Sequence, residues 1–343
     1  MSDLLNIIRQ LKPYQRLLES ITSGPFPLQL GLIRSARLPV AAALSHDLGR
    51  SAALLSHRRD RAINHFDELA IWGAELGAVY LPEPSALFYE NAPWSETARR
   101  ERLNALARLS SVQSSPLFLT SSARAVMSKT IPVREFRQAS FEIKRDQQLE
   151  PLAFAEALVH NGYSNAYSVA EAGQFARRGG MIDVWPMQLE NPLRIEFFGD
   201  SIESLREFDA ASQRSIQRIE ASLIPPAREF LQIDQDAGRE FSEFDIPLLH
   251  PQAGNLLDYL ADDALIFLDD REAILASIHE FERQALELRE QEIEAGKLAD
   301  DFPRPYFSAS ELEEMLEQRT VIELGPAGQN QDLEELAQAF RPG

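Results

Sequence analysis

Hydrophobic and polar positions alternate between two periods along the first third of the chain. The apolar run 52–55 predicts a short buried strand, and Ile63, Phe66 and Leu69 then recur at helical spacing. The order continues with a strand in "GAVYLPEP", a helix opening at Ser95 in "SETARRERLNALARLSS", and a strand in "PLFLTSSARAV". Strands that alternate with helices indicate a parallel sheet covered on both faces.

The middle of the chain has a different pattern. After the helical segment "EPLAFAEALVHNGY", residues 174–224 are mostly strand-like, with turn signals at Gly179, Gly180, Asn191 and Gly199. This pattern predicts an antiparallel α+β module. The last third returns to alternation, with a buried strand in "DALIFLDD", a long helix ending near residue 296, and a strand in "RTVIEL".

These changes of pattern divide the chain into three parts. Residues 1–128 and 216–343 are predicted to be the two halves of one α/β domain, and residues 129–215 an α+β module inserted into it. The opening stretch "MSDLLNIIRQLKPYQRLLES" predicts one amphipathic helix, and the stretch from residue 325 onward is polar and weakly patterned. A length of 343 residues also favours more than one domain.

Composition narrows the compartment and the class of partner. No apolar run approaches the roughly 20 residues of a membrane span, and no signal peptide is recognisable, so a cytoplasmic location is expected. The chain has no cysteine, which excludes disulfides and thiolate metal sites. The net charge is −19, and residues 216–343 hold 10 basic and 29 acidic groups. This balance argues against a dedicated DNA-binding chain.

The sequence has no phosphate loop of the kind that binds nucleotides. Such a loop needs several glycines and a lysine, but "QLGLIRSARLPVAAALS" offers Gly31 alone, has no lysine, and places Pro39 where the following helix should open. Asp269 and Asp270 follow an apolar strand, as a magnesium pair would. Without a phosphate loop, we expect them instead to cap the next helix at its positive end.

Other candidate chemistry is equally weak. The six histidines lack ligand spacing, and consecutive Ser45, His46 and Asp47 cannot converge as a triad. No catalytic, cofactor-binding or metal-binding residue is predicted. Two interpretations stay open for the aromatics Phe88, Tyr89 and Trp94: base stacking, or anchoring of a loop to its domain, which the neighbouring glutamates favour.

The segment 179–209 carries the most informative surface. In "LRIEFFG", Arg194, Glu196 and Phe198 share one strand face and Ile195 and Phe197 the other. The outer face would present Arg194 and Phe198 together, with Arg178 at the start of the neighbouring strand. A phenylalanine flanked by arginines is typical of a protein-binding hot spot. A lattice of cross-strand Arg–Glu pairs with a partly buried phenylalanine explains the pattern equally well.

A family resemblance rests on this same segment. Residues 173–226 contain "RG...IDV.P" followed by "P.RIEFFGD.IESLR.FD...QRS", and they resemble the module shared by the excision-repair protein UvrB and the transcription-repair coupling factors, the Mfd family. The flanking segments follow the order of that family over nearly the whole chain. The resemblance implies a degenerate RecA-like, P-loop-type, parallel-sheet domain split by an inserted α+β antiparallel module.

Two departures distinguish the two branches of the family. UvrB has a phosphate loop where this chain reads "GLIRSARLP", and a long tyrosine-rich hairpin where it has only "FYENAPWSETARR". In lacking both features, the chain resembles the coupling factors, whose N-terminal region does not hydrolyse ATP. The resemblance implies that Arg178, Arg194 and Phe198 bind UvrA, without cofactor or metal, and thereby recruit excision repair to a stalled RNA polymerase.

The same resemblance implies what this chain does not contain. In the family, the RNA polymerase-binding domain and the ATP-dependent DNA translocase lie further toward the C-terminus, so the chain is expected to be a non-catalytic N-terminal fragment. Two alternatives are kept open. The module could be structural or autoinhibitory, masking its own UvrA-binding surface against other domains of the full-length protein, or the chain could be a UvrB-like ATPase, which the missing phosphate loop opposes.

Overall fold

The computed structural model describes residues 2–23, 28–72, 76–111, 115–231 and 241–325. The chain divides into two compact units. Unit 1 consists of residues 1–89, 111–128 and 256–343, and unit 2 of residues 90–110 and 129–255. The stretch expected to be a polar tail lies, from residue 326 onward, outside the described residues.

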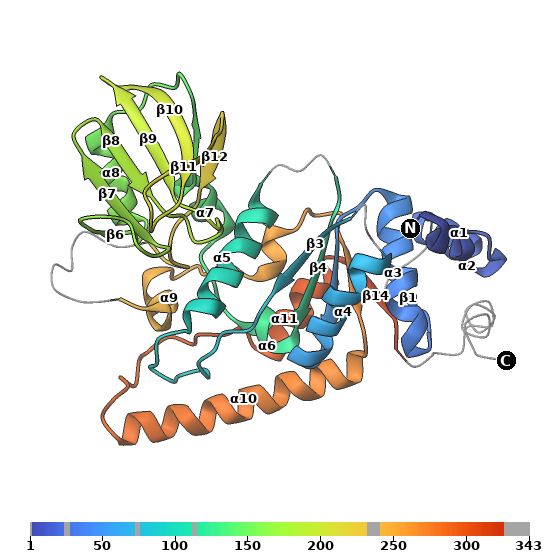
Figure 1. Ribbon diagram of the computed structural model, residues 1–343. Helices are drawn as coiled ribbons and strands as arrows, with labels where there is room; N and C mark the ends of the chain where they lie inside the picture. The colour runs from blue at the N-terminus through green and yellow to red at the C-terminus, as the bar shows by residue number, and fades with distance from the viewer. Residues whose placement is uncertain (1, 24–27, 73–75, 112–114, 232–240, 326–343) are drawn as a thin grey trace. The chain divides into compact units, whose positions relative to one another are not determined.

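Unit 1 is built on a six-stranded parallel sheet with the order β1-β14-β13-β2-β4-β3 (Figure 1). Every residue of the three central strands is buried, as expected when helices cover both faces of a sheet. The predicted parallel sheet is therefore confirmed. Its strands are β1 (Leu28–Gln29), β2 (Ala52–Ser56), β3 (Gly77–Leu81), β4 (Leu117–Ser122), β13 (Leu265–Leu268) and β14 (Thr320–Glu323).

The helices of unit 1 are α1 (Ser2–Arg9), α2 (Lys12–Ser23), α3 (Arg34–Leu48), α4 (Arg59–Trp72), α6 (Ala123–Met127), η2 (Leu256–Tyr259), α10 (Arg271–Glu294) and α11 (Ala309–Glu317). The connections through α3 and α4 step along the sheet in one direction, and those through α10 and α11 in the other. Right-handed crossovers therefore place α3 and α4 on one face and α10 and α11 on the opposite face. No helix in the described ranges has the length and apolar character that crossing a membrane requires.

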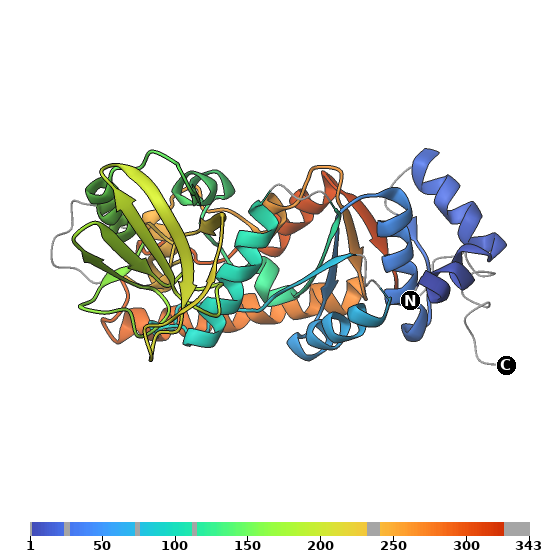
Figure 2. The same ribbon diagram turned by 45° about the horizontal axis from the view of Figure 1, so that its top comes forward.

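Two predictions near the N-terminus, both at segments that contain a proline, are wrong. The opening stretch forms two helices, not one, and Figure 2 shows these dark blue helices beside α3. Pro13 stands in the first turn of α2, where its missing N–H is tolerated, and one continuous helix would place it in the interior. The expectation that Pro39 marks a helix start is also wrong, because α3 begins at Arg34 and contains Pro39.

Unit 2 contains a six-stranded sheet with the order β11-β10-β9-β8-β7-β6, shown in green and yellow in Figure 1. Neighbouring strands are antiparallel except for the short parallel pair β6 and β7. The strands are β6 (Ser164–Asn165), β7 (Gln174–Arg178), β8 (Met181–Val184), β9 (Leu193–Phe198), β10 (Ser201–Phe208) and β11 (Ser215–Arg218). A separate antiparallel pair joins β5 (Phe141–Lys144) and β12 (Ala221–Ile224). The helices are α5 (Glu96–Ser110), α7 (Val133–Ala139), α8 (Pro151–His160), η1 (Glu243–Asp245) and α9 (Ile246–Leu249).

Unit 2 extends beyond the expected module 129–215 in both directions. Arg102 of α5 is buried and forms a bidentate ion pair with buried Glu229, at 2.5 and 2.9 Å. Thr130 donates a 2.7 Å hydrogen bond to the same carboxylate. Separating the two residues would leave a buried charge without its partner, which costs several kcal/mol. These contacts therefore tie α5 and the segment around residue 229 to the module.

Candidate functional site

In α/β domains, nucleotides bind at the carboxyl ends of the parallel strands. In unit 1, two arginines lie at this edge and bind Asp269. Asp269 follows β13 and is completely buried. Arg37 donates to its Oδ1 at 2.8 Å and to its backbone oxygen at 2.6 Å, and Arg61 donates to Oδ2 at 2.8 Å. Both carboxylate oxygens therefore accept from guanidinium groups that come from α3 and α4.

This arrangement shifts the pKa values of two groups. Burial alone would raise the pKa of Asp269, but the hydrogen bond from Arg37 and the neighbouring charges outweigh it and hold the pKa below its usual value. Burial lowers the pKa of His65 to about 4, so this histidine is neutral at pH 7. Among the described residues, no three acidic or histidine side chains are grouped to hold a metal ion.

The pair Asp269 and Asp270 was expected to cap a helix, and only one of the two does. Asp270 is the N-cap of α10, accepting from the backbone N–H of Ala273 at 3.1 Å. Asp269 instead pairs with arginines that lie more than 200 residues away in sequence. The capping interpretation is thus confirmed for Asp270 and wrong for Asp269.

The aromatic residues between β3 and α5 are anchored. In unit 1, Phe88 and Tyr89 are buried and their rings lie 4.8 and 6.2 Å from that of Tyr306. In unit 2, buried Trp94 lies under the guanidinium of Arg102, 5.0 Å from the ring centre. Rings packed in this way do not offer their faces to bases, so the structure favours anchoring over base stacking.

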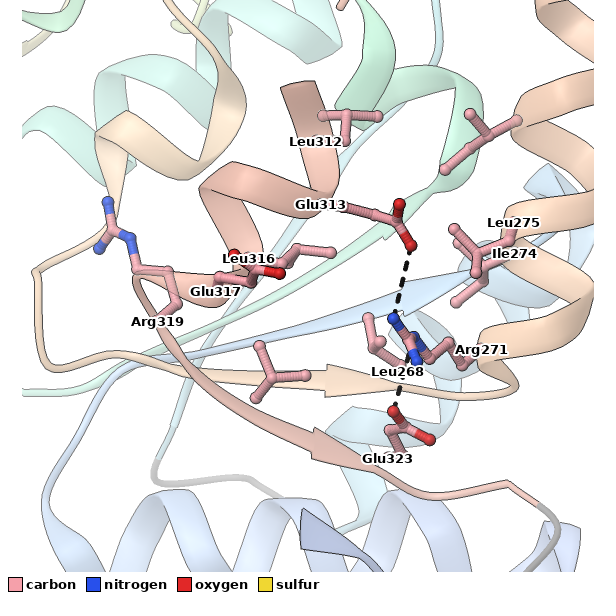
Figure 3. A pocket seen from close by; sticks show the side chains of 12 residues that line it. Leu268, Arg271, Ile274, Leu275, Leu312, Glu313, Leu316, Glu317, Arg319 and Glu323 are labelled. Carbon is pink, nitrogen blue, oxygen red and sulfur yellow. Dashed lines mark hydrogen bonds and ion pairs between the residues drawn. The ribbon is translucent and has the colours of Figure 1, made fainter. Parts of the chain in front are cut away.

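Unit 1 also contains an apolar cavity of about 110 Å³ between α10, α11 and the sheet. Leu268, Ile274 and Leu312 are among the residues that line it (Figure 3). Arg271 spans the rim, with nitrogen atoms 3.4 Å from Glu313 and 3.6 Å from Glu323. Because this arginine is already paired with two acids, the cavity offers apolar contact more than recognition of charge.

The sheet of unit 2 has one buried and one accessible face. Along β9, Ile195 and Phe197 are buried, whereas Arg194, Glu196 and Phe198 are partly or fully accessible. The predicted division of this strand into two faces is therefore confirmed. Cross-strand pairing places two rows on this face: one joins Arg178 through Met181 to Glu196, and the next joins buried Asp183 to Arg194 and Arg206.

Arg194 is held within the sheet. Its Nε and Nη2 donate to the two carboxylate oxygens of Asp183, both at 2.7 Å, and Nη2 also donates to Gln213 at 2.8 Å. Its guanidinium lies 4.3 Å from the ring centre of Phe208. The hydrogen bond to Asp183 raises the pKa of Arg194. Only 12% of its side chain is exposed, so most of its bonding capacity is used internally.

Arg178 is accessible, but it stands at the end of β7 and not at the start of a strand as predicted. Gly179, with φ 59°, and Gly180 form the tight turn to β8, and the left-handed conformation at position 179 suits glycine. Nε and Nη2 of Arg178 donate to the backbone oxygen of Tyr167 at 3.2 and 2.7 Å. The guanidinium lies 5.3 Å from the centre of the Tyr167 ring.

Phe198 ends β9 on the same accessible face and is 81% exposed. It lies two residues beyond Glu196, at the end of the sheet where the turn between Arg178 and Met181 also lies. The lattice interpretation of the segment is confirmed for its arginines and wrong for Phe198. Arg194 pairs with Asp183 and Arg206 with Glu196 in a cross-strand lattice, whereas the phenylalanine is exposed rather than partly buried.

Tyr167 is an exposed residue that no sequence pattern indicated. It follows the two-residue strand β6 in a loop without hydrophobic periodicity, and it is 93% exposed. Phe198 and Tyr167 are the two most exposed large apolar side chains in the described part of the chain. We call Tyr167, Arg178 and Phe198 the sheet-end patch. Arg194 lies one row further into the sheet.

Comparison with known proteins identifies the family. A profile of the UvrB interaction domain matches residues 141–230, which include the sheet of unit 2. Over 88% of its length, the chain is 25% identical to the transcription-repair-coupling factor of Bacillus subtilis, and over 66% it is 30% identical to that of Myxococcus xanthus. The chain matches the UvrB-homology region of the transcription-repair-coupling factors. A UvrABC system protein B, from Thermosipho africanus, is 22% identical over 67% of the chain.

This UvrB-homology region corresponds to a small share of its relatives. The matched parts cover 29% of the Bacillus subtilis protein, 19% of the Myxococcus xanthus protein and 36% of the Thermosipho africanus protein. The chain therefore spans little more than a third of these proteins at most.

Proposed function

We propose that unit 2 binds UvrA through the accessible face of its sheet. The observation that carries this proposal is the exposure of both Phe198 and Arg178 at the same end of the sheet, within the segment that matches the UvrB interaction domain. An exposed aromatic ring next to an arginine with free donors is the composition of a binding hot spot, because the ring loses its contact with water and the guanidinium can bind a carboxylate.

The chain would then act by recruitment. UvrA and its associated UvrB would be brought to a lesion where RNA polymerase has stalled, by a surface that imitates that of UvrB. The regions that contact polymerase and move along DNA would belong to the rest of a longer protein. This division of labour agrees with the acidic balance of the chain, which does not favour phosphate binding.

We also propose that unit 1 is a degenerate RecA-like domain without ATPase activity. The support is the occupied ligand edge of its parallel sheet: Arg37 and Arg61 bind the carboxylate of Asp269, which in a nucleotide site would face magnesium. Titration with a fluorescent ATP analogue and magnesium tests this proposal. Saturable binding in the micromolar range would contradict it and favour a UvrB-like ATPase.

Autoinhibition is a second candidate, favoured by the same exposed side chains. A surface that carries Phe198 in the open is suited to be covered when the chain is part of a larger protein. Comparing the UvrA affinity of this chain with that of the full-length protein separates the two possibilities. Masking predicts tighter binding by this chain, and equal affinities would exclude it.

Calorimetric titration of UvrA into the chain at physiological salt tests the proposed binding. Micromolar or tighter binding is expected, with a tenfold or greater loss in Phe198→Ala. Leu152→Ala is a matched control, because Leu152 is an exposed apolar side chain of unit 2 on α8 instead of the sheet. An absence of binding by the unmodified chain would contradict the proposal.

A further inference from the structure

Tyr167 has an arrangement that its own burial does not explain. A tyrosine that is 93% exposed contributes little to the core, yet its ring and its backbone oxygen both contact one side chain, that of Arg178. In the described part of the chain, the Tyr167 hydroxyl makes no hydrogen bond. The contacts of this residue thus order Arg178 more than they hold Tyr167 itself.

The order of the strands shows where this pair lies. Tyr167 follows β6, Arg178 ends β7, and Phe198 ends β9, in a sheet that runs β6-β7-β8-β9. Arg178 therefore lies between the two exposed rings. Neighbouring strands are about 4.8 Å apart, so Arg178 and Phe198 are separated by about 10 Å across the strands and by a further two residues, about 7 Å, along them. This spacing suits a single partner segment lying across the strand ends.

The chemistry of the patch defines the segment it would bind. Arg178 has five N–H donors, and two of its nitrogens bond the Tyr167 oxygen, which leaves donors for an outside acceptor. An exposed guanidinium held against a ring matches a carboxylate, and a neighbouring exposed phenylalanine matches an apolar side chain. The complementary partner is a protein segment that presents a carboxylate next to an apolar residue.

We infer that Tyr167 is a positioning residue: it fixes the Arg178 guanidinium so that the sheet-end patch binds an acidic and apolar segment of UvrA. An arginine on a surface loses considerable side-chain entropy when a partner immobilises it. Two hydrogen bonds and ring stacking by Tyr167 restrict Arg178 before the partner arrives, so less entropy is lost on binding. This inference rests on the proposed binding of UvrA by unit 2.

Three substitutions of Tyr167 separate its possible roles. Tyr167→Phe keeps the ring and the backbone oxygen, and its affinity for UvrA should stay within twofold of the parent. Tyr167→Leu keeps an apolar side chain but removes the ring face that contacts Arg178, and Tyr167→Ala removes the ring face and the apolar area. Each should weaken binding by about fivefold or more. The thermal unfolding of all three should match that of the parent, because the side chain is exposed.

A double-mutant cycle tests whether Tyr167 acts through Arg178. With Arg178→Ala already present, Tyr167→Leu should change the affinity for UvrA by less than twofold. Ile216→Ala is the matched control, since Ile216 is a half-exposed apolar residue of β11 in the same sheet, and it should leave the affinity unchanged.

The outcomes distinguish this inference from the function on which it rests. If Tyr167→Leu binds UvrA within twofold of the parent while Phe198→Ala loses binding, Tyr167 has no positioning role but the docking proposal holds. An equal loss with and without Arg178 would also overturn the inference. If the unmodified chain does not bind UvrA, the docking proposal fails and the inference with it.

Discussion

Each unit holds a buried aspartate in an ion pair with arginine, and the surroundings of the two pairs differ. In unit 1, Asp269 is completely buried and its two oxygens are bound by arginines from two helices. In unit 2, Asp183 is 2% exposed and both of its oxygens are bound by Arg194, on a sheet face whose next row and strand ends are accessible. Arginine–carboxylate pairing by itself therefore indicates stability in both units. Unit 2 differs in having two exposed aromatic side chains, Tyr167 and Phe198, at one end of its sheet.

The largest expected effect concerns the ion pair of unit 2. Arg194→Ala leaves Asp183 buried without its counter-charge, and we expect it to lower the free energy of unfolding by roughly 3–5 kcal/mol. Urea denaturation followed by circular dichroism measures this change. A change below about 1 kcal/mol would show that the pair is not what maintains this part of the sheet.

This expectation affects how binding data on Arg194 are interpreted. We also expect Arg194→Ala to weaken UvrA binding by about 2 kcal/mol or more, but loss of the fold would produce the same result. The double variant Asp183→Asn/Arg194→Gln removes both charges and should be less destabilised than Arg194→Ala. If this double variant stays folded and binds UvrA as the parent does, the guanidinium of Arg194 is not a partner contact.

The corresponding change in unit 1 should be smaller. In Arg37→Ala, Asp269 loses the hydrogen bonds to its Oδ1 and its backbone oxygen but keeps Arg61 at Oδ2, so we expect a destabilisation of about 1.5–3 kcal/mol. Thermal unfolding of the variant beside the parent measures it. A destabilisation larger than that of Arg194→Ala would reverse the order of the two pairs and contradict the contribution assigned to Arg61.

The closed environment in unit 1 should also appear in the pH dependence of stability. Burial lowers the pKa of His65 to about 4 from 6.5, so the folded state binds fewer protons than the unfolded state between these values. With neutral His65 buried, the free energy of unfolding is at its full value above pH 6.5, and it decreases as the pH falls toward 4 because the unfolded state takes up a proton that the folded state does not. We expect His65 to account for about 2 kcal/mol of the loss between pH 7 and pH 5. Urea denaturation at both pH values should show a smaller loss in His65→Gln; equal losses would contradict the assignment.

The smallest expected effect is that of Arg178→Ala on stability. Its guanidinium is exposed and its hydrogen bonds go to a surface loop, so the free energy of unfolding should change by less than about 0.5 kcal/mol. Urea denaturation beside Arg194→Ala provides the comparison. Destabilisation of Arg178→Ala by more than about 1 kcal/mol would mean that the sheet-end patch maintains the fold, as the Asp183 pair does.

Local pattern predicted much of the two sheets. The alternation of β9, the buried run of β13 and the cap at Asp270 are each determined by residues within a few positions of one another, and each agrees with the structure. The two N-terminal helices show the limit of periodicity, since the apolar spacing continues through Pro13 although the helix does not.

Long-range contacts could not be predicted in the same way. Nothing near Arg37 in sequence points to Asp269, and nothing near Arg102 points to Glu229, because each pair is formed only when distant segments come together. The residues proposed to bind UvrA show a related limit. Arg178 and Phe198 were found through a motif, but Arg194 is paired internally with an acid from another strand, and Tyr167 belongs to no pattern.

The most direct test of the central claim is a calorimetric titration of UvrA into the chain and into Phe198→Ala. Phe198 is chosen because it is 81% exposed, so its removal should leave the fold intact. We expect micromolar or tighter binding by the parent and at least tenfold weaker binding by the folded variant. Equal binding by the two proteins, or no binding by either, would contradict the claim that this face of unit 2 docks onto UvrA.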